Sequence, residues 1–330
     1  RFLLHSSFGP TDEDVRMVQN LGFSGWIDQQ ISLPPTLHST YAREINDDFF
    51  GPRVHKNYSY GDTFLFGNNL QTAFARAAIG SEDQLRQRVA FALSQILVAS
   101  RRDANLENRV LGMASFYDFF VRHALGNYED ILQEVALHPC MGRYLSHLGN
   151  QKANPEINQY PDENFAREVM QLFTIGLWKL NPDGTRQIGA NGQAIPTYSN
   201  TDITQLARVF TGLWYSNHAW GNGGWSESDF TVPMGLHPDR HDFGTKTLLG
   251  GAIIPSRSAT AENARKDIRD AISLLFQHEN TAPFVSRQLI QFLVTDNPTP
   301  AYVQRVASVF INNGNGKRGD LAAVVRAILL

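Results

Sequence analysis

Residues 160–176 read YPDENFAREVMQLFTIG, and the spacing of their apolar side chains decides the fold class. An α-helix turns by about 100 degrees per residue, so side chains three and four positions apart share a face. One face of this stretch collects Phe165, Val169, Leu172 and Phe173. Charged side chains fall elsewhere or at the edge of that face, and Gly176 supplies a stop signal. The stretch therefore predicts an amphipathic helix that packs against a core.

The same periodicity recurs on both sides of this helix and dominates the chain. Pro, Gly or Asn stands at nearly every joint between one periodic segment and the next. The predicted helices cover residues 11–22, 68–80, 82–100, 108–123, 127–137, 162–176, 200–212, 261–277, 281–294, 299–312 and 319–330. We therefore expect a mainly α protein, with a multi-helix orthogonal or bundle-like single domain over residues 1–330.

Three stretches interrupt this rhythm. Residues 33–67 are rich in Pro, Tyr, Phe and Asn without a clear period, so we expect an irregular excursion. Residues 179–198 hold two turn signals, at 181–184 and 191–192, and predict a β-hairpin arm. Residues 214–255 form a long loop rich in Trp and Gly. A loop of that length is typical of a functional segment or of strands that the pattern does not reveal.

Composition limits the partners of the protein. The chain has 330 residues, 29 Lys and Arg against 32 Asp and Glu, and a net charge of −3. A nucleic-acid binder needs a basic excess on one face, so we expect no nucleic-acid partner.

No stretch approaches the roughly 18 apolar residues of a membrane span. The chain opens at Arg1 without a Met, so we expect a segment of a longer precursor.

The only cysteine, Cys140, is a poor candidate for a nucleophile. It stands in the apolar run Leu137–Met141, where a cysteine behaves as a small buried hydrophobe. His138 is expected to be a helix-end residue rather than its base.

Two stretches together resemble a known family. Residues 160–176 resemble the N-E-N-x-A-R-E-L-x-E-L-x-T-x-G signature of the family catalogued as domain of unknown function 1800. Residues 198–212 (YSNTDITQLARVFTG) resemble the next helix of that family, and residues 1–9 and 241–246 also fit, so the likeness spans nearly the whole chain. Residues 92–97 lack the F-W-H-x-H-F-like stretch of many relatives, so no His-based metal site is carried over there. The resemblance implies an exported bacterial protein, periplasmic or secreted and largely helical, and it implies no reaction.

Two carboxylates of the motif helix are candidates for acid and base chemistry. Glu168 falls at the edge of the apolar face, where a half-buried carboxylate needs a partner, and Arg208 and Arg88 are the candidates. Glu163 and Arg167 are four apart and can pair along the outer flank. Two carboxylates can divide acid and base work if their pKa values differ, although these two point roughly 140 degrees apart. A structural ion pair and a catalytic role both stay open for Glu168.

A second cluster lies in the long loop, where His237, Asp239, His241 and Asp242 stand within six residues. Alternate positions of an extended segment point to one side, so such groups can ligate a divalent metal, but the spacing matches no standard zinc signature. A carboxylate beside an imidazole also orients a general base, which favours the pair His241 and Asp242. The alternative is a hydrogen-bonded His–Asp staple that fixes the loop. No cofactor is predicted.

Aromatic residues of the same loop are interleaved with Gly, Asn and His. Flat aromatic faces beside amide donors suit sugar rings, and exposed aromatics also anchor protein partners. The predicted substrate-binding residues are Trp214, Trp220, Trp225, Arg167 and Arg208. A loop folded over the core for stability is the alternative.

These candidates support two hypotheses. The first is an exported bacterial enzyme, a glycosidase-like hydrolase, that acts on a polysaccharide or another polymer. Its acid and base chemistry is assigned to Glu163, Glu168, His241 and Asp242. The second is a non-catalytic cell-surface or periplasmic module for binding or assembly, whose partner is a glycan, another polymer or a protein at the aromatic loop.

Overall fold

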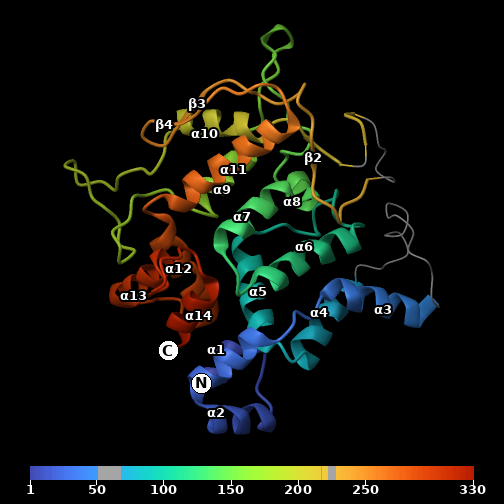
Figure 1. Cartoon of the computed structure of the whole chain (residues 1–330), viewed down its shortest axis with the longest axis vertical. Coiled ribbons are helices and arrows are strands. Elements are labelled where there is room, and N and C mark those ends of the chain that lie inside the picture. The colour runs from blue at the N-terminus through green and yellow to red at the C-terminus, as the bar shows by residue number, and fades with distance from the viewer. Residues whose placement is uncertain (51–67, 217, 222–227) are drawn as a thin grey trace.

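The protein is mainly α-helical, as the periodicity predicts, and its strands are few and short (Figure 1). The structure is a computed structural model and describes residues 1–50, 68–216, 218–221 and 228–330. The α-helices are α1 (Phe2–Ser6), α2 (Asp12–Ser32), α3 (His38–Phe50), α4 (Asn68–Gly80), α5 (Gln84–Ile96), α6 (Val110–His123), α7 (Tyr128–Leu137), α8 (Pro139–Tyr144), α9 (Asn164–Gln171), α10 (Asn200–Ala207), α11 (Ala261–Gln277), α12 (Thr281–Leu293), α13 (Pro300–Ile311) and α14 (Leu321–Leu329). Short 3-10 turns are η2 (Pro155–Ile157) and η3 (Arg208–Phe210). The strands β1 (Leu213–Trp214) and β2 (Gly235–Leu236) pair antiparallel, as do β3 (Lys246–Leu248) and β4 (Ala252–Ile254).

Helices with strong local signals lie where the sequence predicts them. The bounds of α4 and α11 match the predicted ranges residue for residue. The first predicted helix begins at a capping box between Thr11 and Asp14. Gly22 does break that helix, with φ of 70°, but helical structure resumes at once and continues to Ser32. The prediction of one short helix at 11–22 was therefore wrong in its extent.

The expectation of an irregular excursion over residues 33–67 was partly wrong. Residues 38–50 form helix α3, and residues 51–67 lie outside the described part of the chain. The cap of α3 comes from a distant side chain: the Asp118 carboxylate of α6 accepts the backbone N–H of His38 (2.6 Å) and of Ser39 (3.2 Å). Because this cap is 80 positions away in the sequence, no local pattern announces the helix.

Helix α8 is a second helix that the sequence pattern does not predict. The imidazole of His138 caps it, since its Nδ1 accepts the backbone N–H of Cys140 (3.2 Å). His138 is thus a helix-end residue, as expected. Cys140 is fully buried, which confirms the expectation of a small hydrophobic side chain in the core.

The predicted hairpin arm at 179–198 is built from three short extended segments. Isolated bridges join Leu180 to Arg186, Ile188 to Ala194 and Trp178 to Pro196 in antiparallel pairs. Each segment therefore pairs with both of the others, around two turns at 181–184 and 189–192. The predicted turn signals stand at these two turns.

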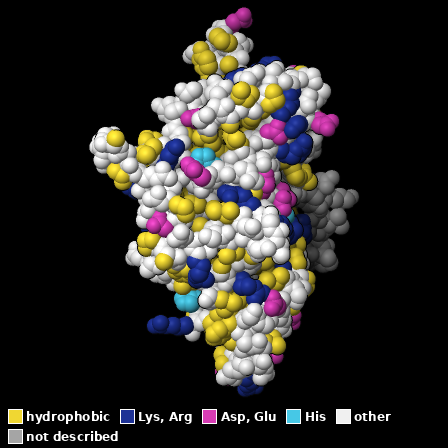
Figure 2. Space-filling view, turned by 60° about the vertical axis from the view of Figure 1, so that its left-hand side comes forward, with side chains coloured by type: hydrophobic (Ala, Val, Ile, Leu, Met, Phe, Trp, Pro, Cys, Tyr) yellow, Lys and Arg dark blue, Asp and Glu magenta, His cyan; other side chains and the backbone are white. Residues whose placement is uncertain are grey.

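Among the described residues, a large hydrophobic core cluster extends from Leu3 to Ile328, and a small second cluster holds Val110 and Leu111. At its centre α5 and α6 pack together, α7 packs against α11, and α12 reaches both α5 and α13 (Figure 1). The surface in Figure 2 shows Lys and Arg interspersed with Asp and Glu on one face. None of the described helices combines the length and the apolar character needed to cross a membrane.

Candidate functional site

The motif helix α9 is held in place by its apolar face and linked to α10 by Glu163. Phe165, Val169 and Phe173 are buried as predicted. Leu172 is 45% exposed, against expectation, because the helix ends at Gln171 and the chain turns there. Glu163 precedes the helix, and its Oε1 accepts a hydrogen bond from Thr204 Oγ1 of α10 (2.8 Å).

The predicted pair between Glu163 and Arg167 is present. Arg167 Nη2 lies 3.4 Å from Glu163 Oε2, and both side chains are 42% exposed. An exposed ion pair of this kind contributes about 0–1 kcal/mol. It therefore orients side chains on the outer flank and adds little stability.

Glu168 is half-buried, but neither predicted arginine partner reaches it. Arg208 binds Asp242 instead, and Arg88 donates to the backbone oxygen of Phe292 (3.2 Å). Glu168 Oε2 is buried and has no hydrogen-bond partner among the described residues. Burial raises the pKa of Glu168, and the neighbouring Arg167 offsets part of that rise. Glu168 is therefore a carboxyl group that protonates more readily than an ordinary one.

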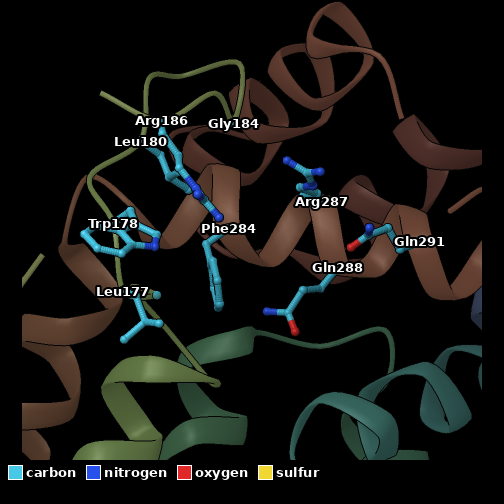
Figure 3. A pocket seen from close by; sticks show the side chains of 10 residues that line it. Leu177, Trp178, Leu180, Gly184, Arg186, Phe284, Arg287, Gln288 and Gln291 are labelled. Carbon is cyan, nitrogen blue, oxygen red and sulfur yellow. The ribbon is translucent and has the colours of Figure 1, made fainter. Parts of the chain in front are cut away.

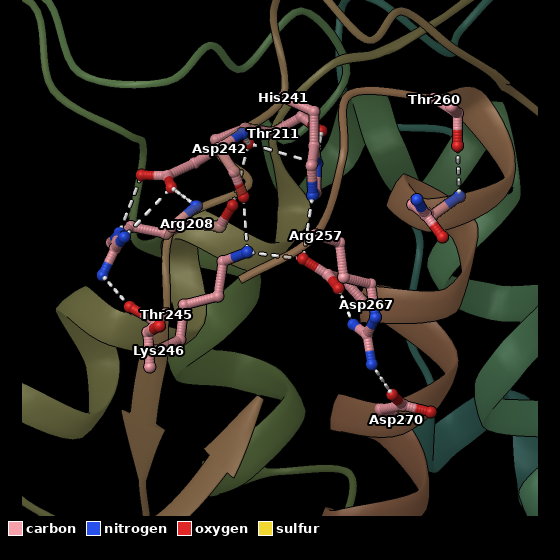
Figure 4. A network of polar contacts seen from close by, with 12 residues as sticks. Arg208, Thr211, His241, Asp242, Thr245, Lys246, Arg257, Thr260, Asp267 and Asp270 are labelled. Atoms are coloured by element: carbon pink, nitrogen blue, oxygen red, sulfur yellow. Dashed lines mark hydrogen bonds and ion pairs between the residues drawn. The ribbon is translucent and has the colours of Figure 1, made fainter. Parts of the chain in front are cut away.

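Arg208 and Asp242 form a two-pronged ion pair at the edge of a larger polar network (Figure 4). Arg208 Nε donates to Asp242 Oδ2 (2.7 Å) and Nη2 donates to Oδ1 (3.0 Å). A Cβ at Gly244 would lie 2.7 Å from Arg208 Nη2, so a side chain there would displace the guanidinium from its present position. Burial alone would raise the pKa of Asp242, but the hydrogen bonds from Arg208 and from the Gly244 N–H hold it below its ordinary value.

His241 points into the protein, and its side chain is fully enclosed. Its Nδ1 lies 2.8 Å from the backbone oxygen of Thr211, and its Nε2 lies 3.3 Å from Asp267 Oδ2. Burial lowers the pKa of His241 to about 4; the Thr211 hydrogen bond opposes this and the nearby Lys246 adds to it. Both ring nitrogens face protein atoms.

Asp267 of α11 is the centre of the network (Figure 4). Lys246 Nζ donates to Asp267 Oδ2 (2.5 Å), and both side chains are fully buried. Arg257 binds Asp267 Oδ1 with one prong and Asp270 with the other. Lys246 Nζ also donates to the backbone oxygen of Asp242.

Every carboxylate of the network is paired with at least one cation. Its carboxylates are Asp242, Asp267 and Asp270, and its cations are Arg208, Lys246, Arg257 and, at the exposed end, Lys266. Burial lowers the pKa of Lys246 to about 8, with Asp242 opposing that fall and the two arginines adding to it. The arrangement ties the end of α10, the loop 237–246 and α11 together. It favours the staple interpretation of His241 and Asp242, and a catalytic role for either stays a prediction.

Sequence reasoning missed Asp267 and Arg257, but a signal for Asp267 exists. The residue stands among the buried residues of α11, of which the others are Ala264, Ile268, Ala271, Ile272, Leu275 and Phe276. A lone carboxylate inside an apolar stripe requires a buried partner. One such partner is Lys246 on β3, and helical periodicity does not predict which strand residue lies against α11.

The side chains of Asp239 and His237 have partners other than His241 and Asp242. Asp239 is 67% exposed and pairs with Arg240 (3.0 Å), whereas His237 lies edge-on against the Trp220 ring (centroids 5.4 Å apart). In the part of the chain that the structure describes, no three His, Cys, Asp or Glu side chains are grouped so that they could hold a metal ion.

The predicted aromatic residues are brought together in part. Trp214 and Trp220 lie with ring centroids 5.2 Å apart, and the Arg240 guanidinium lies 5.7 Å from the Trp220 centroid. Trp214 is fixed by β1 and by Gly149, where a Cβ would lie 3.1 Å from its ring. Both rings are half-buried. Trp225 lies outside the described residues.

The comparisons with known proteins give one match. A family model described as "Protein of unknown function (DUF1800)" matches residues 1–330. Among curated proteins and among solved structures, none matches the chain.

Proposed function

We propose, from the premise that the chain belongs over its whole length to the family described as protein of unknown function (DUF1800), that it is a non-catalytic module that binds a glycan or a similar polymer. The binding surface is formed by Trp214, Trp220, His237 and Arg240, which we call the tryptophan surface.

The observation that carries the proposal is the support beneath Trp220. Its ring rests against Trp214 and His237 while remaining half-exposed, and Arg240 beside it is tied to Gln151 Oε1 (3.1 Å). A rigid, flat aromatic face with a fixed cation and an amide beside it suits the apolar face and the hydroxyl groups of a sugar ring. Little ordering is then needed on binding.

The surroundings of the predicted acid and base residues favour binding over catalysis. A general base must reach a substrate proton within hydrogen-bond distance. His241 is fully enclosed, Asp242 is held by Arg208, and both carboxylate oxygens of Glu163 have partners. A periplasmic or cell-surface location belongs to the same proposal and rests on the resemblance stated above.

Replacement of Trp220 tests the proposal. Trp220→Ala should weaken binding at least about tenfold, because a central aromatic anchor loses its contact area. Affinity electrophoresis in gels that contain soluble xylan, β-glucan, dextran or polygalacturonate measures the loss as reduced retardation. Tyr160→Ala, which removes a 63% exposed aromatic from another site, is the matched control and should leave retardation unchanged. Equal losses in the two variants, or no retardation of the wild type by any of these polymers, would contradict the proposal.

Glu168 favours one second candidate, the glycosidase-like enzyme. Its buried, unpartnered Oε2 and raised pKa are the properties of a general acid. On this alternative the wild type releases reducing sugar from one of the same polymers, and Glu168→Gln lowers the rate by about 10²–10⁴-fold. Glu156→Gln, at an exposed carboxylate outside the motif helix, is the matched control and should leave the rate unchanged.

The outcomes separate the two candidates. The binding module predicts retardation of the wild type without any product. If the wild type releases product and Glu168→Gln does not, the protein is the enzyme and the binding-module proposal is wrong. If the wild type releases no product, the enzyme alternative is wrong.

A further inference from the structure

A cavity of about 250 Å³ opens between the hairpin arm and helix α12 (Figure 3). Trp178 and Arg186 line it from the arm, and Phe284 and Arg287 line it from the helix. The tryptophan surface of the proposed function is made of other residues and does not contribute to it.

The two walls of the cavity are joined by a fully buried amide. Asn280, directly before α12, donates from Nδ2 to the backbone oxygens of Ile175 and Trp178 (both 2.8 Å). Its Oδ1 accepts the backbone N–H of Leu180 (2.9 Å). These three hydrogen bonds fix the start of the arm to the start of the helix, so the cavity is pre-formed rather than created by a ligand.

The helical wall is a single stripe of α12. Phe284, Arg287, Gln288 and Gln291 stand at positions i, i+3, i+4 and i+7, which lie on one face of a helix. Gly176, with φ of 68°, allows this approach, because a Cβ there would lie 2.7 Å from the Phe284 ring. The stripe therefore offers one aromatic ring, one guanidinium and two amides to the same space.

The cavity carries uncompensated positive charge. In the described residues neither Arg186 nor Arg287 has an ion pair or a side-chain hydrogen bond, and both are exposed. Arg186 lies 5.8 Å from the centroid of the Trp178 ring. The nearby carboxylate of Asp183 accepts two hydrogen bonds from Thr185 instead, one from its N–H (2.9 Å) and one from its hydroxyl (2.6 Å). Figure 3 shows the two guanidinium groups on facing sides of the opening.

Side chains rather than backbone amides would hold an anion here. The N–H groups of Gly176, Leu180 and Gly184 donate to Met170 O, Asn280 Oδ1 and Asn181 O, each at 2.9 Å. A backbone nest of the kind that captures a peptide carboxyl terminus is therefore not offered by these residues. A planar guanidinium binds carboxylate and sulfate with two parallel hydrogen bonds.

We infer that this cavity binds an acidic sugar unit, with its carboxylate or sulfate between Arg186 and Arg287 and its apolar ring face on Trp178 and Phe284. Gln288 and Gln291 each donate from Nε2 to a backbone oxygen, of Leu172 (3.3 Å) and of Asp296 (2.9 Å), and their amide oxygens would accept from ring hydroxyl groups. Pockets for drug-sized ligands span about 300–1,000 Å³, so a cavity of this size takes one terminal unit of a chain rather than a long segment. The inference concerns a second site and stands apart from the proposed function.

Calorimetric titration with four probes tests the inference. Trigalacturonate carries carboxylates, galactose 6-sulfate carries a sulfate, galactotriose is neutral, and tetraglutamate is an acidic peptide. We expect at least one acidic sugar to bind and the two other probes not to bind. Which acidic sugar binds identifies the anionic group.

Charge-removing variants locate the site. Arg186→Gln and Arg287→Gln should each weaken acidic-sugar binding at least about tenfold, because each removes a charge-assisted hydrogen bond to the ligand. Both side chains are exposed, so we expect both variants to fold. Trp178→Ala should weaken it as well. Arg269→Gln, which removes an exposed charge from α11, is the matched control and should have no effect.

Each other outcome overturns the inference. It fails if neither acidic sugar binds, if tetraglutamate binds better, or if Arg269→Gln costs as much affinity as the cavity variants. Loss of acidic-sugar binding in Trp220→Ala alone would assign it to the tryptophan surface and leave the proposed function intact.

Discussion

Asp267→Asn is expected to lower the free energy of unfolding by about 3–5 kcal/mol. The variant keeps the size of the side chain but removes the charge that compensates Lys246, whose ammonium group is fully buried. Arg257 loses one of its two carboxylate partners at the same time. Breaking a buried pair leaves an uncompensated charge in a medium of low polarity, and that loss exceeds the net value of the pair itself.

Urea denaturation followed by tryptophan fluorescence measures this change. Asp239→Asn is the matched control, because that carboxylate is 67% exposed and its pair with Arg240 contributes about 0–1 kcal/mol. The double variant Asp267→Asn, Lys246→Met should recover part of the loss, since it removes both buried charges. A change of less than about 1 kcal/mol for Asp267→Asn would show that Asp267 and Lys246 do not form a buried ion pair in the folded protein.

Acidification from pH 7.5 to 4.5 is expected to lower the free energy of unfolding, and two buried histidines, His138 and His147, account for about 5 kcal/mol of that loss. Burial, assisted by Arg122, lowers the pKa of His138 to about 3. Burial also lowers the pKa of His147 to about 4, against a hydrogen bond to the Ala136 oxygen. In the unfolded chain both titrate near 6.5. Between these values the unfolded state binds more protons, so stability is greatest above about pH 6.5 and is lost as the pH falls toward 4.

Two variants isolate this effect from the titration of other groups. His147→Gln keeps a donor for the Ala136 oxygen, and His138→Asn keeps an acceptor for the Cys140 N–H that starts α8. Each should remove about half of the loss that these two histidines cause, whereas the loss from buried His241, whose pKa is also lowered to about 4, stays in both variants. The free energy of unfolding of each variant is measured at both pH values. A change in packing affects both measurements and therefore cancels in their difference. Asp118 and Glu168, whose folded pKa values are raised, act in the opposite sense. Variants that lose as much stability on acidification as the wild type would refute the assignment.

The fold was predictable wherever the signals are local. The capping box at Thr11 and the caps at Asn127 and Thr260 mark helix starts that lie where expected. Helix α3 was missed because its cap is the distant Asp118 carboxylate. The burial of Leu172 was also predicted wrongly. Its position on the helical wheel predicts burial, but the residue follows the last turn of α9 and is exposed.

The site was predictable only in its parts. The pairing of Glu163 with Arg167 follows from helical spacing and is present. The partner of Arg208 was predicted wrongly, because Asp242 lies 34 residues along the chain and a loop of irregular path brings it there. Asp267 and Lys246 meet between α11 and β3 for the same reason. Contacts between distant segments depend on tertiary packing, which spacing rules do not contain.

The burial of Cys140 has a practical consequence for experiments. It is the only thiol in the sequence, and it lies enclosed against Gly112, where an added Cβ would come within 3.3 Å of its sulfur. A cysteine introduced at an exposed position such as Ile188 on the arm would therefore be the one readily modified thiol in the folded protein. Spin labels or fluorophores can thus be attached at chosen positions without removing the native residue, and a pair of introduced cysteines, one on the arm and one on the body of the molecule, makes the distance between them measurable in solution.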